Sequence, residues 1–398
     1  MGSVGPALVV VLMPEDTRFL DAEVAGQAAG RYLLNALLRL VDAEVTILTR
    51  GAASPAWCAG ITAATPSSLD HRPPGPALIV DGRVWLSDAA LERLWRSDRE
   101  TAITVTTMPT HKRALDDAAP SRLATWLPEY RGGAIDLADV DAPEFVNRGA
   151  TVDAGGLDSL QRLYLLDSFV AVAALERHVL LDRATGLMAS GVRIHDPSAV
   201  YIRGELSCGH GVELDVGVIV EGHVRLGSGV TVGAHAILRE CVIGSGSTIR
   251  PFSLVEQSTI GSDTVVGPYA RIRPASVIGD HVQIGNYVEI KSSRIGSGSR
   301  INHHSFVGDA DLAENVTIGA GTITCNHDGT RTVQTVIERG AYIGSGVRLV
   351  APVRVGSDAT IGAGSTITHD VPPSKLTVAR SRQATIDHWP GRKSRQRQ

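Results

Sequence analysis

The sequence predicts an α/β N-terminal region followed by a parallel β-helix built from hexapeptide repeats. Aliphatic residues return about every six positions from Leu214 to Ile367, very often with Gly next in the chain. Such a period is the signature of a β-helix solenoid. Residues 1–185 have no hexads, and their apolar runs alternate with helical patterns. That alternation is typical of an α/β sheet.

The N-terminal region contains the elements expected of an α/β domain. Strands are predicted at Ala7–Met13, Val45–Thr49 and Ile103–Thr107, a strand–turn–strand unit over Ala77–Leu86, and helices at Phe19–Val41, Ser87–Leu94 and Leu157–Leu181. The turn is placed at Asp81-Gly82, and Ser87 is the expected helix cap. The last helix leads into the solenoid, which Asp196-Pro197 introduces.

This region lacks the glycine loops that hold nucleotide phosphates. The stretch after the first strand, LVVVLMPEDTRF, has neither G-x-G nor a Walker pattern. Asp81 follows an apolar run, as a metal-binding Asp might be placed, but a turn Asp before Gly is the favoured interpretation. We expect no metal site, because the four cysteines show neither pairing nor metal-ligand spacing.

The solenoid places one aliphatic side chain of each hexad inside, and three hexads make one triangular coil. Gly suits the corners, where backbone angles are unusual for residues with a Cβ. The spacing shortens to five near every third hexad, as between Leu238 and Ile243. Each coil buries its apolar residues only by stacking on its neighbours.

The ladder breaks between Thr324 and Ile343, where the segment reads TCNHDGTRTVQTVIERGAY. Asn326, Asp328 and Gly329 are turn-forming residues. We therefore predict a loop projecting from one corner of a coil. Loops on a rigid scaffold commonly carry function, so the site is expected here.

Composition excludes several classes of protein. A chain of 398 residues suggests two domains, and its net charge of −4 gives no nucleic-acid footprint. Residues 391–398 form a short basic tail, which is expected to be disordered and solubilising. No apolar run reaches membrane-span length, and Ala7–Met13 is too short for a signal peptide. A reducing cytoplasm fits the cysteine usage, and neither nucleic-acid nor membrane partners are expected.

Several strings are more specific than the hexad period, namely GPYARIRP, GNYVEIKSSRIG, VGDADL, NVTIGAGTITCNHDG, LVAPVRVG and TIGAGSTITHDV. Over roughly Leu181 to Trp389 the chain resembles the acetyltransferase domain of the bacterial bifunctional N-acetylglucosamine-1-phosphate uridyltransferase/glucosamine-1-phosphate N-acetyltransferase family. The resemblance implies a left-handed parallel β-helix and a homotrimer with active sites between subunits. It also implies acetyl-CoA as co-substrate and a small-molecule amine as acceptor.

The same resemblance assigns roles to individual residues. His303 matches the general base, and a neutral imidazole near pH 7 suits removal of a proton from an attacking amine. Asn326 matches an acyl-transfer residue that either polarises the thioester carbonyl or orients the amine. Arg273 and Lys291 match the residues that grip a phosphate. The positions that match contacts to coenzyme A are Ala320, Ser345, Ala363 and Arg380.

Four positions at the acceptor site depart from the family. Phe306 stands where the family has Tyr, Thr317 where it has Asn, His327 where it has Tyr, and Thr332 where it has Lys. Lost hydrogen bonds of this kind weaken discrimination by about 1–3 kcal/mol each. The acceptor therefore stays open between an amino-sugar phosphate and another nitrogen nucleophile.

The N-terminal region departs further, because only Thr17-Arg18 remains of the family's G-T-R-M loop. We predict a divergent nucleotidyltransferase-like domain without transfer activity over residues 1–185, a β-helix acetyltransferase over 186–390 and the tail over 391–398. The main hypothesis is an acetyl-CoA-dependent N-acetyltransferase. The alternatives are a bifunctional nucleotidyltransferase/acetyltransferase and a non-catalytic trimeric scaffold.

Overall fold

A computed structural model describes residues 7–12, 18–39, 43–48, 56–59, 61–64, 75–81, 84–86, 102–107, 121–130, 149–153, 163–165, 168–385 and 387. The chain divides into two compact units, Met1–Asp182 and Arg183–Gln398. We call them unit 1 and unit 2 and describe each separately.

Unit 1 is built on a mixed sheet in the order β10-β8-β9-β6-β1-β4-β5. Strand β9 runs antiparallel to β6 and β8, and the other neighbours are parallel. The predicted strands in this sheet are confirmed to within a few residues. The strands are β1 Ala7–Leu12, β4 Ala43–Leu48, β5 Thr62–Ala64, β6 Gly75–Asp81, β8 Ala102–Thr107, β9 Ser121–Tyr130 and β10 Gly149–Asp153.

The single long helix predicted at Phe19–Val41 is wrong. The segment forms α1 Arg18–Asp21, a hairpin of β2 Glu23–Val24 and β3 Gln27–Ala28, and α2 Ala29–Leu37. The hairpin turn is Ala25-Gly26, with φ of 47° and 91°, and two residues with positive φ are what a tight hairpin needs. A buried apolar face survives on both sides of the turn, so hydrophobic spacing alone did not reveal the break.

The two strands predicted within Ala77–Leu86 are present as β6 and β7, Val84–Leu86. They do not pair with each other, because β7 pairs with β11, Leu163–Leu165, whereas β6 lies between β1 and β9. One further expectation for unit 1 needs correction. The helix predicted at Leu157–Leu181 begins only at Phe169 and continues to Ala189 as α6. The expected helix at Ser87–Leu94, the turn residue Gly82 and the tail 391–398 lie outside the described residues.

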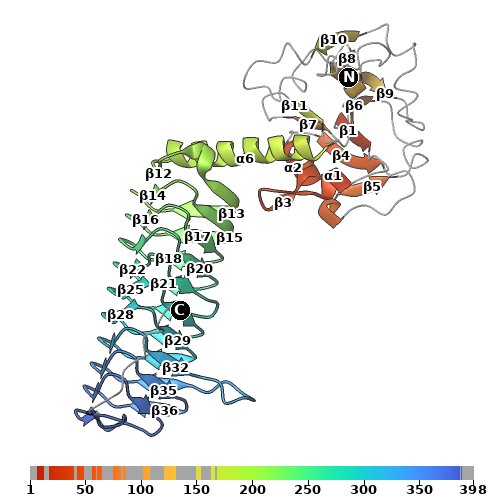
Figure 1. Ribbon diagram of the computed structural model, residues 1–398. Helices are drawn as coiled ribbons and strands as arrows, with labels where there is room; N and C mark the ends of the chain where they lie inside the picture. Colours follow the sequence, from red (N-terminus) through yellow and green to blue (C-terminus); the bar gives the residue numbers. More distant parts are fainter. Residues whose placement is uncertain are drawn as a thin grey trace, which may run out of the picture. The chain divides into compact units, whose positions relative to one another are not determined.

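Unit 2 is a parallel β-helix of stacked triangular coils (Figure 1), which confirms the predicted fold class. The first coil begins at β12, Arg193–Ile194. Asp196 then caps a short 3₁₀ turn, η4 Pro197–Ala199, and its carboxylate accepts from the Ser198 amide at 2.9 Å. Every strand pair of the solenoid is parallel, and neighbouring coils are in register.

The coils present three faces, each made of strands one coil apart. Face 1 comprises β13 Tyr201–Cys208, β15 Ile219–Leu226, β17 Ile237–Arg239, β20 Leu254–Glu256, β23 Arg271–Ile272, β26 Glu289–Lys291, β29 Phe306–Gly308, β32 Ile323–Cys325, β35 Arg348–Val350 and β38 Thr366–Ile367. Face 2 continues from the ends of β13 and β15 into β18 Val242–Ile243, β21 Thr259–Ile260, β24 Val277–Ile278, β27 Arg294–Ile295, β30 Ala310–Leu312, β33 Thr335–Ile337 and β36 Val353–Val355.

Face 3 is a separate sheet. After β12 it contains β14 Glu213–Leu214, β16 Thr231–Val232, β19 Thr248–Ile249, β22 Val265–Val266, β25 Gln283–Asn286, β28 Arg300–His303, β31 Thr317–Ile318, β34 Tyr342–Ile343, β37 Thr360–Ile361 and β39 Leu376–Thr377.

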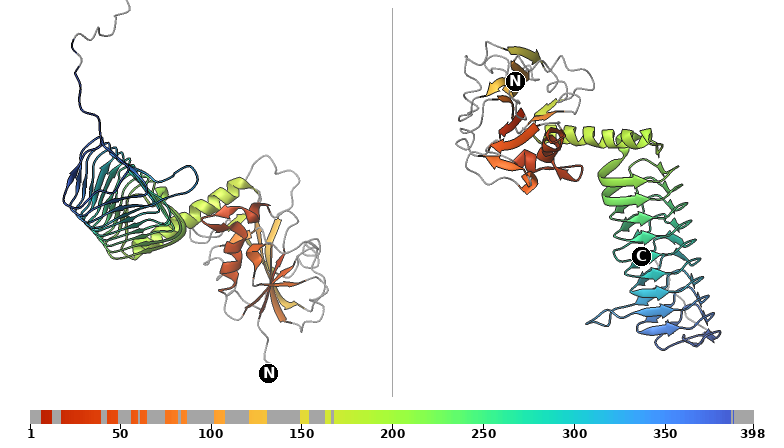
Figure 2. Two further views of the ribbon diagram at one scale, coloured as in Figure 1. Left: turned by 90° about the horizontal axis from the view of Figure 1, so that it is seen from below. Right: turned by 180° about the vertical axis from the view of Figure 1, so that it is seen from behind.

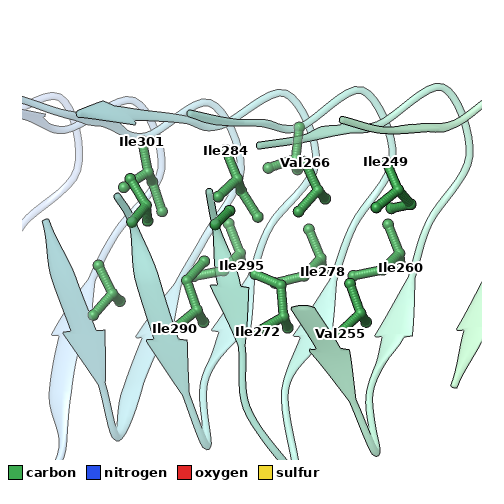
Figure 3. Close-up of a cluster of buried hydrophobic side chains, with 14 of the residues drawn as sticks. Ile249, Val255, Ile260, Val266, Ile272, Ile278, Ile284, Ile290, Ile295 and Ile301 are labelled. Atoms are coloured by element: carbon green, nitrogen blue, oxygen red, sulfur yellow. The ribbon is translucent and has the colours of Figure 1, made fainter. Parts of the chain in front are cut away.

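The interior of the solenoid is filled by the aliphatic ladder. All residues of the predicted six-residue repeat from Leu214 to Ile367 are at most 4% exposed. Figure 3 shows these side chains, among them Ile249, Ile260 and Ile272, pointing inward from the strands. Fully burying an aliphatic side chain stabilises by about 1.5–3 kcal/mol, so the ladder is the main source of stability.

The corner between faces 3 and 1 carries a stack of rings, which we call the aromatic ladder. It consists of His235, Phe252, Tyr269, Tyr287 and His304, with ring centroids 4.9–5.4 Å apart in successive coils. Each of these residues has a left-handed φ between 45° and 59°. The expectation that Gly fills such corners therefore holds only for some coils, because ring stacking along the corner accompanies the unusual backbone in the others.

Replacing Ile249 with Ala should destabilise the solenoid by about 2–5 kcal/mol, because it removes a fully buried side chain and leaves a cavity. The matched control is Val242→Ala on β18, the preceding strand of the chain, since Val242 is 41% exposed. Urea unfolding followed by circular dichroism measures both changes. Equal losses in the two variants would show that the ladder does not hold the coils together.

Candidate active site

The predicted base and three of the four predicted coenzyme contacts lie in one line, which we call the corner row. Asn286 is in register with His303. The amides of Gly321, Gly346 and Gly364 donate to the carbonyls of His303, Ala320 and Ser345. The row therefore reads Asn286, His303, Ala320, Ser345 and Ala363, one residue per coil. Neighbouring parallel strands are about 4.8 Å apart.

His303 stands at the end of β28 with its side chain exposed. Its Nδ1 lies 2.8 Å from Oδ1 of Asn286. An amide oxygen only accepts hydrogen bonds, so this contact assigns the ring hydrogen to Nδ1. In the neutral ring Nε2 then keeps its lone pair, which is the form that the predicted role of general base needs.

Arg273 and Lys291 occupy the same position on face 1 in adjacent coils, since the Arg273 amide donates to the carbonyl of Ile290. Both are about one-third exposed and paired with carboxylates. Arg273 Nη1 lies 2.9 Å from Glu289 Oε1, and Lys291 Nζ lies 3.9 Å from Asp309 Oδ2. The two predicted phosphate-binding cations are therefore adjacent, and the Lys291 pair is loose.

The side chains of Phe306 and Asn326 both lie close to Gly308. A Cβ on Gly308 would lie 2.5 Å from the Phe306 ring and 2.9 Å from Asn326 Nδ2, so any other residue here would force these side chains to shift. Nδ2 of Asn326 donates to Oδ2 of Asp309. The structure therefore brings together one predicted substrate residue and one predicted acyl-transfer residue.

The other predicted residues are more spread out. Thr317 lies half-buried on face 3, in register with Arg300 and Tyr342. Arg380 is exposed in the final coil, just after Ala379, whose carbonyl accepts from the Thr366 amide at 3.0 Å. Neither contributes a contact to the group formed by Lys291, Asp309 and Asn326.

The predicted loop is present but shorter than the gap in the hexads. Strand β33, Thr335–Ile337, returns to the coil, and Ile337 is 1% exposed. The projecting part is seen as the blue arm in Figure 2. It is tied by a bridge between His327 and Thr332, so His327 lies at the base of the loop and is exposed.

Asp328 holds the tip of this loop together. Its carboxylate accepts from the amides of Arg331 at 2.8 Å and Thr330 at 2.9 Å. These hydrogen bonds, first that of Arg331 and then those of Thr330, hold the pKa of Asp328 well below its ordinary value of 3.8. The loop is therefore an ordered projection.

Sequence reasoning missed three residues of this site, namely Asn286, Gly308 and Asp309. Asn286 is 17 residues before His303, and Asp309 is 17 residues before Asn326. That interval is one coil, so aligning the sequence of each coil with the next places both residues beside their partners. The six-residue spacing of the apolar ladder does not reveal these outward-facing pairs.

Over the described parts of the chain, no group of three or more His, Cys, Asp or Glu side chains is arranged to hold a metal ion. Among those same residues, no helix has the length and apolar character that crossing a membrane requires.

Family models match two parts of the solenoid. The model described as GMPPB C-terminal domain covers residues 202–288, and that described as Bacterial transferase hexapeptide (six repeats) covers residues 334–369.

Curated relatives confirm the resemblance inferred from the sequence strings. The chain is 41% identical to the Bifunctional protein GlmU of Chromobacterium violaceum over 273 residues, which is 68% of this chain and 60% of the relative. It is 50% identical to that of Nitrosospira multiformis over 224 residues, 56% of this chain and 49% of the relative. The chain thus spans about 60% or less of the length of these relatives.

Solved structures give weaker likenesses. The Arabidopsis UDP-N-acetylglucosamine acyltransferase has a TM-score of 0.27 and 17% identity, covering 48% of this chain and 70% of its own. The Campylobacter jejuni UDP-N-acetylglucosamine acyltransferase has a TM-score of 0.26 and 18% identity, covering 46% and 70%.

The low pKa of Asp328 predicts a pH dependence of the loop. Because the pKa of Asp328 is lower in the folded loop than in the unfolded chain, its ionised carboxylate stabilises the loop at pH values above 3.8. This stabilisation is lost as the pH falls through the folded-state pKa. Carboxyl carbon NMR should therefore show Asp328 titrating below 3.8. In Thr330→Gly the midpoint should rise, because one hydroxyl contact is lost. An Asp328 midpoint near 3.8 in the parent would contradict the hydrogen bonds assigned to its carboxylate.

Proposed function

We propose that unit 2 transfers the acetyl group of acetyl-CoA to the amino group of an amino-sugar phosphate. The main observation behind the proposal is the corner row, in which the oriented imidazole of His303 is followed in successive coils by small, exposed residues. Similarity to bifunctional GlmU proteins supports a sugar phosphate over the other nitrogen nucleophiles that the sequence left open.

The chemistry follows from the state of His303. Nε2 removes a proton from the amine as its nitrogen attacks the thioester carbonyl carbon. The carbon–nitrogen bond forms and the carbon–sulfur bond breaks. The proton then passes from His303 to the departing thiolate of coenzyme A. Asn286 keeps Nδ1 engaged, so the same ring nitrogen gives and takes the proton.

The remainder of the corner row suits the arm of coenzyme A. Ala320, Ser345 and Ala363 are exposed and small, so an extended ligand can lie against the backbone of successive coils. Arg380, exposed in the last coil, is our candidate for the contact with a phosphate of the nucleotide end. Acetyl-CoA is thus a co-substrate running along the solenoid axis.

Arg273 and Lys291 are the candidate grip for the acceptor's phosphate. Two adjacent cations attract one dianion, and the planar guanidinium can bind it bidentately. The ion pairs that they form with Glu289 and Asp309 are partly exposed. Such pairs contribute little net stabilisation. A phosphate can displace those carboxylates at little cost.

The sugar itself meets a less polar site than the family provides. Phe306 has no hydroxyl, and its ring packs over Gly308 beside Asn326. Thr317, His327 and Thr332 complete the altered set. We infer that this site forms weaker hydrogen bonds to the sugar hydroxyls than the family's site does. Discrimination between acceptors then depends more on their phosphate and amine groups.

We infer a homotrimer as the working assembly. The aromatic ladder supports this, because Phe252, Tyr269 and Tyr287 are 47–55% exposed and form a stacked strip that adjoins the corner row at Asn286. Apolar strips of this kind commonly mark protein contacts. A light-scattering mass equal to one chain would refute the trimer.

The described cysteines are all unpaired, which favours a cytoplasmic setting.

Replacing His303 with Ala should lower the rate of thiol release from acetyl-CoA by about 10²–10⁴-fold, because the general base is removed. The assay uses glucosamine 1-phosphate as acceptor. His304→Asn is the matched control, since His304 is a neighbouring corner residue and Asn tolerates its φ of 45°. A His303→Ala rate within threefold of the control would exclude His303 as the base.

A second function, nucleotidyl transfer by unit 1, has support from two observations. The similarity covers 68% of the chain, more than unit 2 contains, so it enters unit 1. In the sheet, β1 lies between β4 and β6, and its last residue, Leu12, is in register with Asp81 of β6. In open α/β sheets ligands bind where strand order reverses, at the carboxyl ends of the strands.

The absence of a glycine-rich sequence after β1 argues against this second function. The decisive assay supplies UTP, Mg²⁺ and N-acetylglucosamine 1-phosphate and measures pyrophosphate release. We expect no release above that of a heat-inactivated sample. Sustained release, abolished in Asp81→Asn, would instead establish the bifunctional alternative.

A further inference from the structure

We propose that Asp309 is a positioning residue that links the anion-binding Lys291 to the acyl-transfer residue Asn326. The inference deepens the function proposed above and rests on it. It begins from one oxygen atom, Oδ2 of Asp309, which accepts from Nδ2 of Asn326 and lies 3.9 Å from Nζ of Lys291.

The backbone holds Asp309 firmly at the corner between faces 1 and 2. Its amide donates to the Lys291 carbonyl at 2.9 Å, and its carbonyl accepts from the Thr335 amide at 3.1 Å. Its φ is 49°, in the left-handed region that Asp, Asn and Gly tolerate best among the residues. The side chain is only 22% exposed. The carboxylate is therefore fixed by the fold and spans the coils on either side.

The contact with Asn326 decides which way its amide faces. A carboxylate oxygen only accepts, so the NH₂ group of Asn326 must be turned toward Asp309. The amide oxygen is then the end available to the reactants, and it accepts an N–H of the attacking amine. Of the two roles considered for Asn326, this orientation favours holding the amine over polarising the thioester carbonyl.

The contact with Lys291 is loose and competes with substrate. At 3.9 Å the ammonium is attracted to Asp309 without a hydrogen bond of ordinary length. An anionic acceptor that binds Lys291 draws the ammonium away, and Asp309 then serves Asn326 alone. Binding of the anion and ordering of the amine-holding amide are in this way coupled through one carboxylate.

Two substitutions separate the two contacts. Asp309→Asn keeps an oxygen for Asn326 but removes the charge opposite Lys291. Asp309→Gly removes both contacts and keeps the backbone conformation. Gln257→Gly is the matched control, because Gln257 has the same corner position in an earlier coil, with φ of 41° and an exposed side chain.

In Asp309→Asn, inorganic phosphate should bind about threefold more tightly by calorimetry, since a partly exposed and loose ion pair that competes for Lys291 is removed. Turnover with acetyl-CoA and glucosamine 1-phosphate should keep kcat within threefold. In Asp309→Gly, kcat should fall about 10–100-fold because the placement of the amine is lost. KM for the phosphate-bearing acceptor should stay level or fall, because the carboxylate that competes for Lys291 is lost as well. Gln257→Gly should match the parent.

Three results would overturn the proposal. The first is a kcat for Asp309→Gly within twofold of that of Gln257→Gly. The second is an unchanged phosphate affinity in Asp309→Asn. The third is a rise in KM together with a lowered Tm in Asp309→Gly, which would mark a purely structural role. If the parent itself releases no coenzyme A, the proposed function fails separately. The Asn326 side-chain ¹⁵N resonance then decides, because the proposal requires it to shift in Asp309→Gly but little in Asp309→Asn.

Discussion

The in-register stacking of parallel coils is the constraint on which the rest of unit 2 depends. Each strand is hydrogen-bonded to the strand one coil away, so a residue's position in its hexad fixes which side chains lie above and below it. The apolar position fills the interior, while the outward positions form rows. A buried ladder with almost no exposed area keeps those rows straight, because any slip would expose every aliphatic residue of a strand.

The candidate site uses three such rows. The corner between faces 3 and 1 supplies His303 with its orienting Asn286 and the small residues below it. Face 1 supplies the two cations in adjacent coils. The corner between faces 1 and 2 supplies Asp309 and the base of the projecting loop. Rigid neighbouring rows are well suited to holding an amine, a thioester and an anion at fixed distances, which is where much of the catalytic effect of positioning arises.

The period of the solenoid made its fold readable from the sequence, and every predicted ladder residue is buried. Unit 1 was harder to read. There, helical hydrophobic spacing continued through Ala25-Gly26, although a two-residue turn with positive φ breaks the helix. At the site, the motif matches supplied the candidate reactive residues. They could not point to Asn286 or Asp309, because each contacts its partner one coil away and neither carries a chemical signature alone.

We propose the corner row as the path of the acetyl donor, and a crystal structure with bound acetyl-CoA would show whether the donor lies there. We expect the arm to follow Ala320, Ser345 and Ala363, with the thioester carbonyl next to Nε2 of His303 and the nucleotide end toward Arg380. Acetyl-CoA bound on another face, or no binding at concentrations that saturate acetyltransferases of this kind, would contradict the account and leave the solenoid as a scaffold.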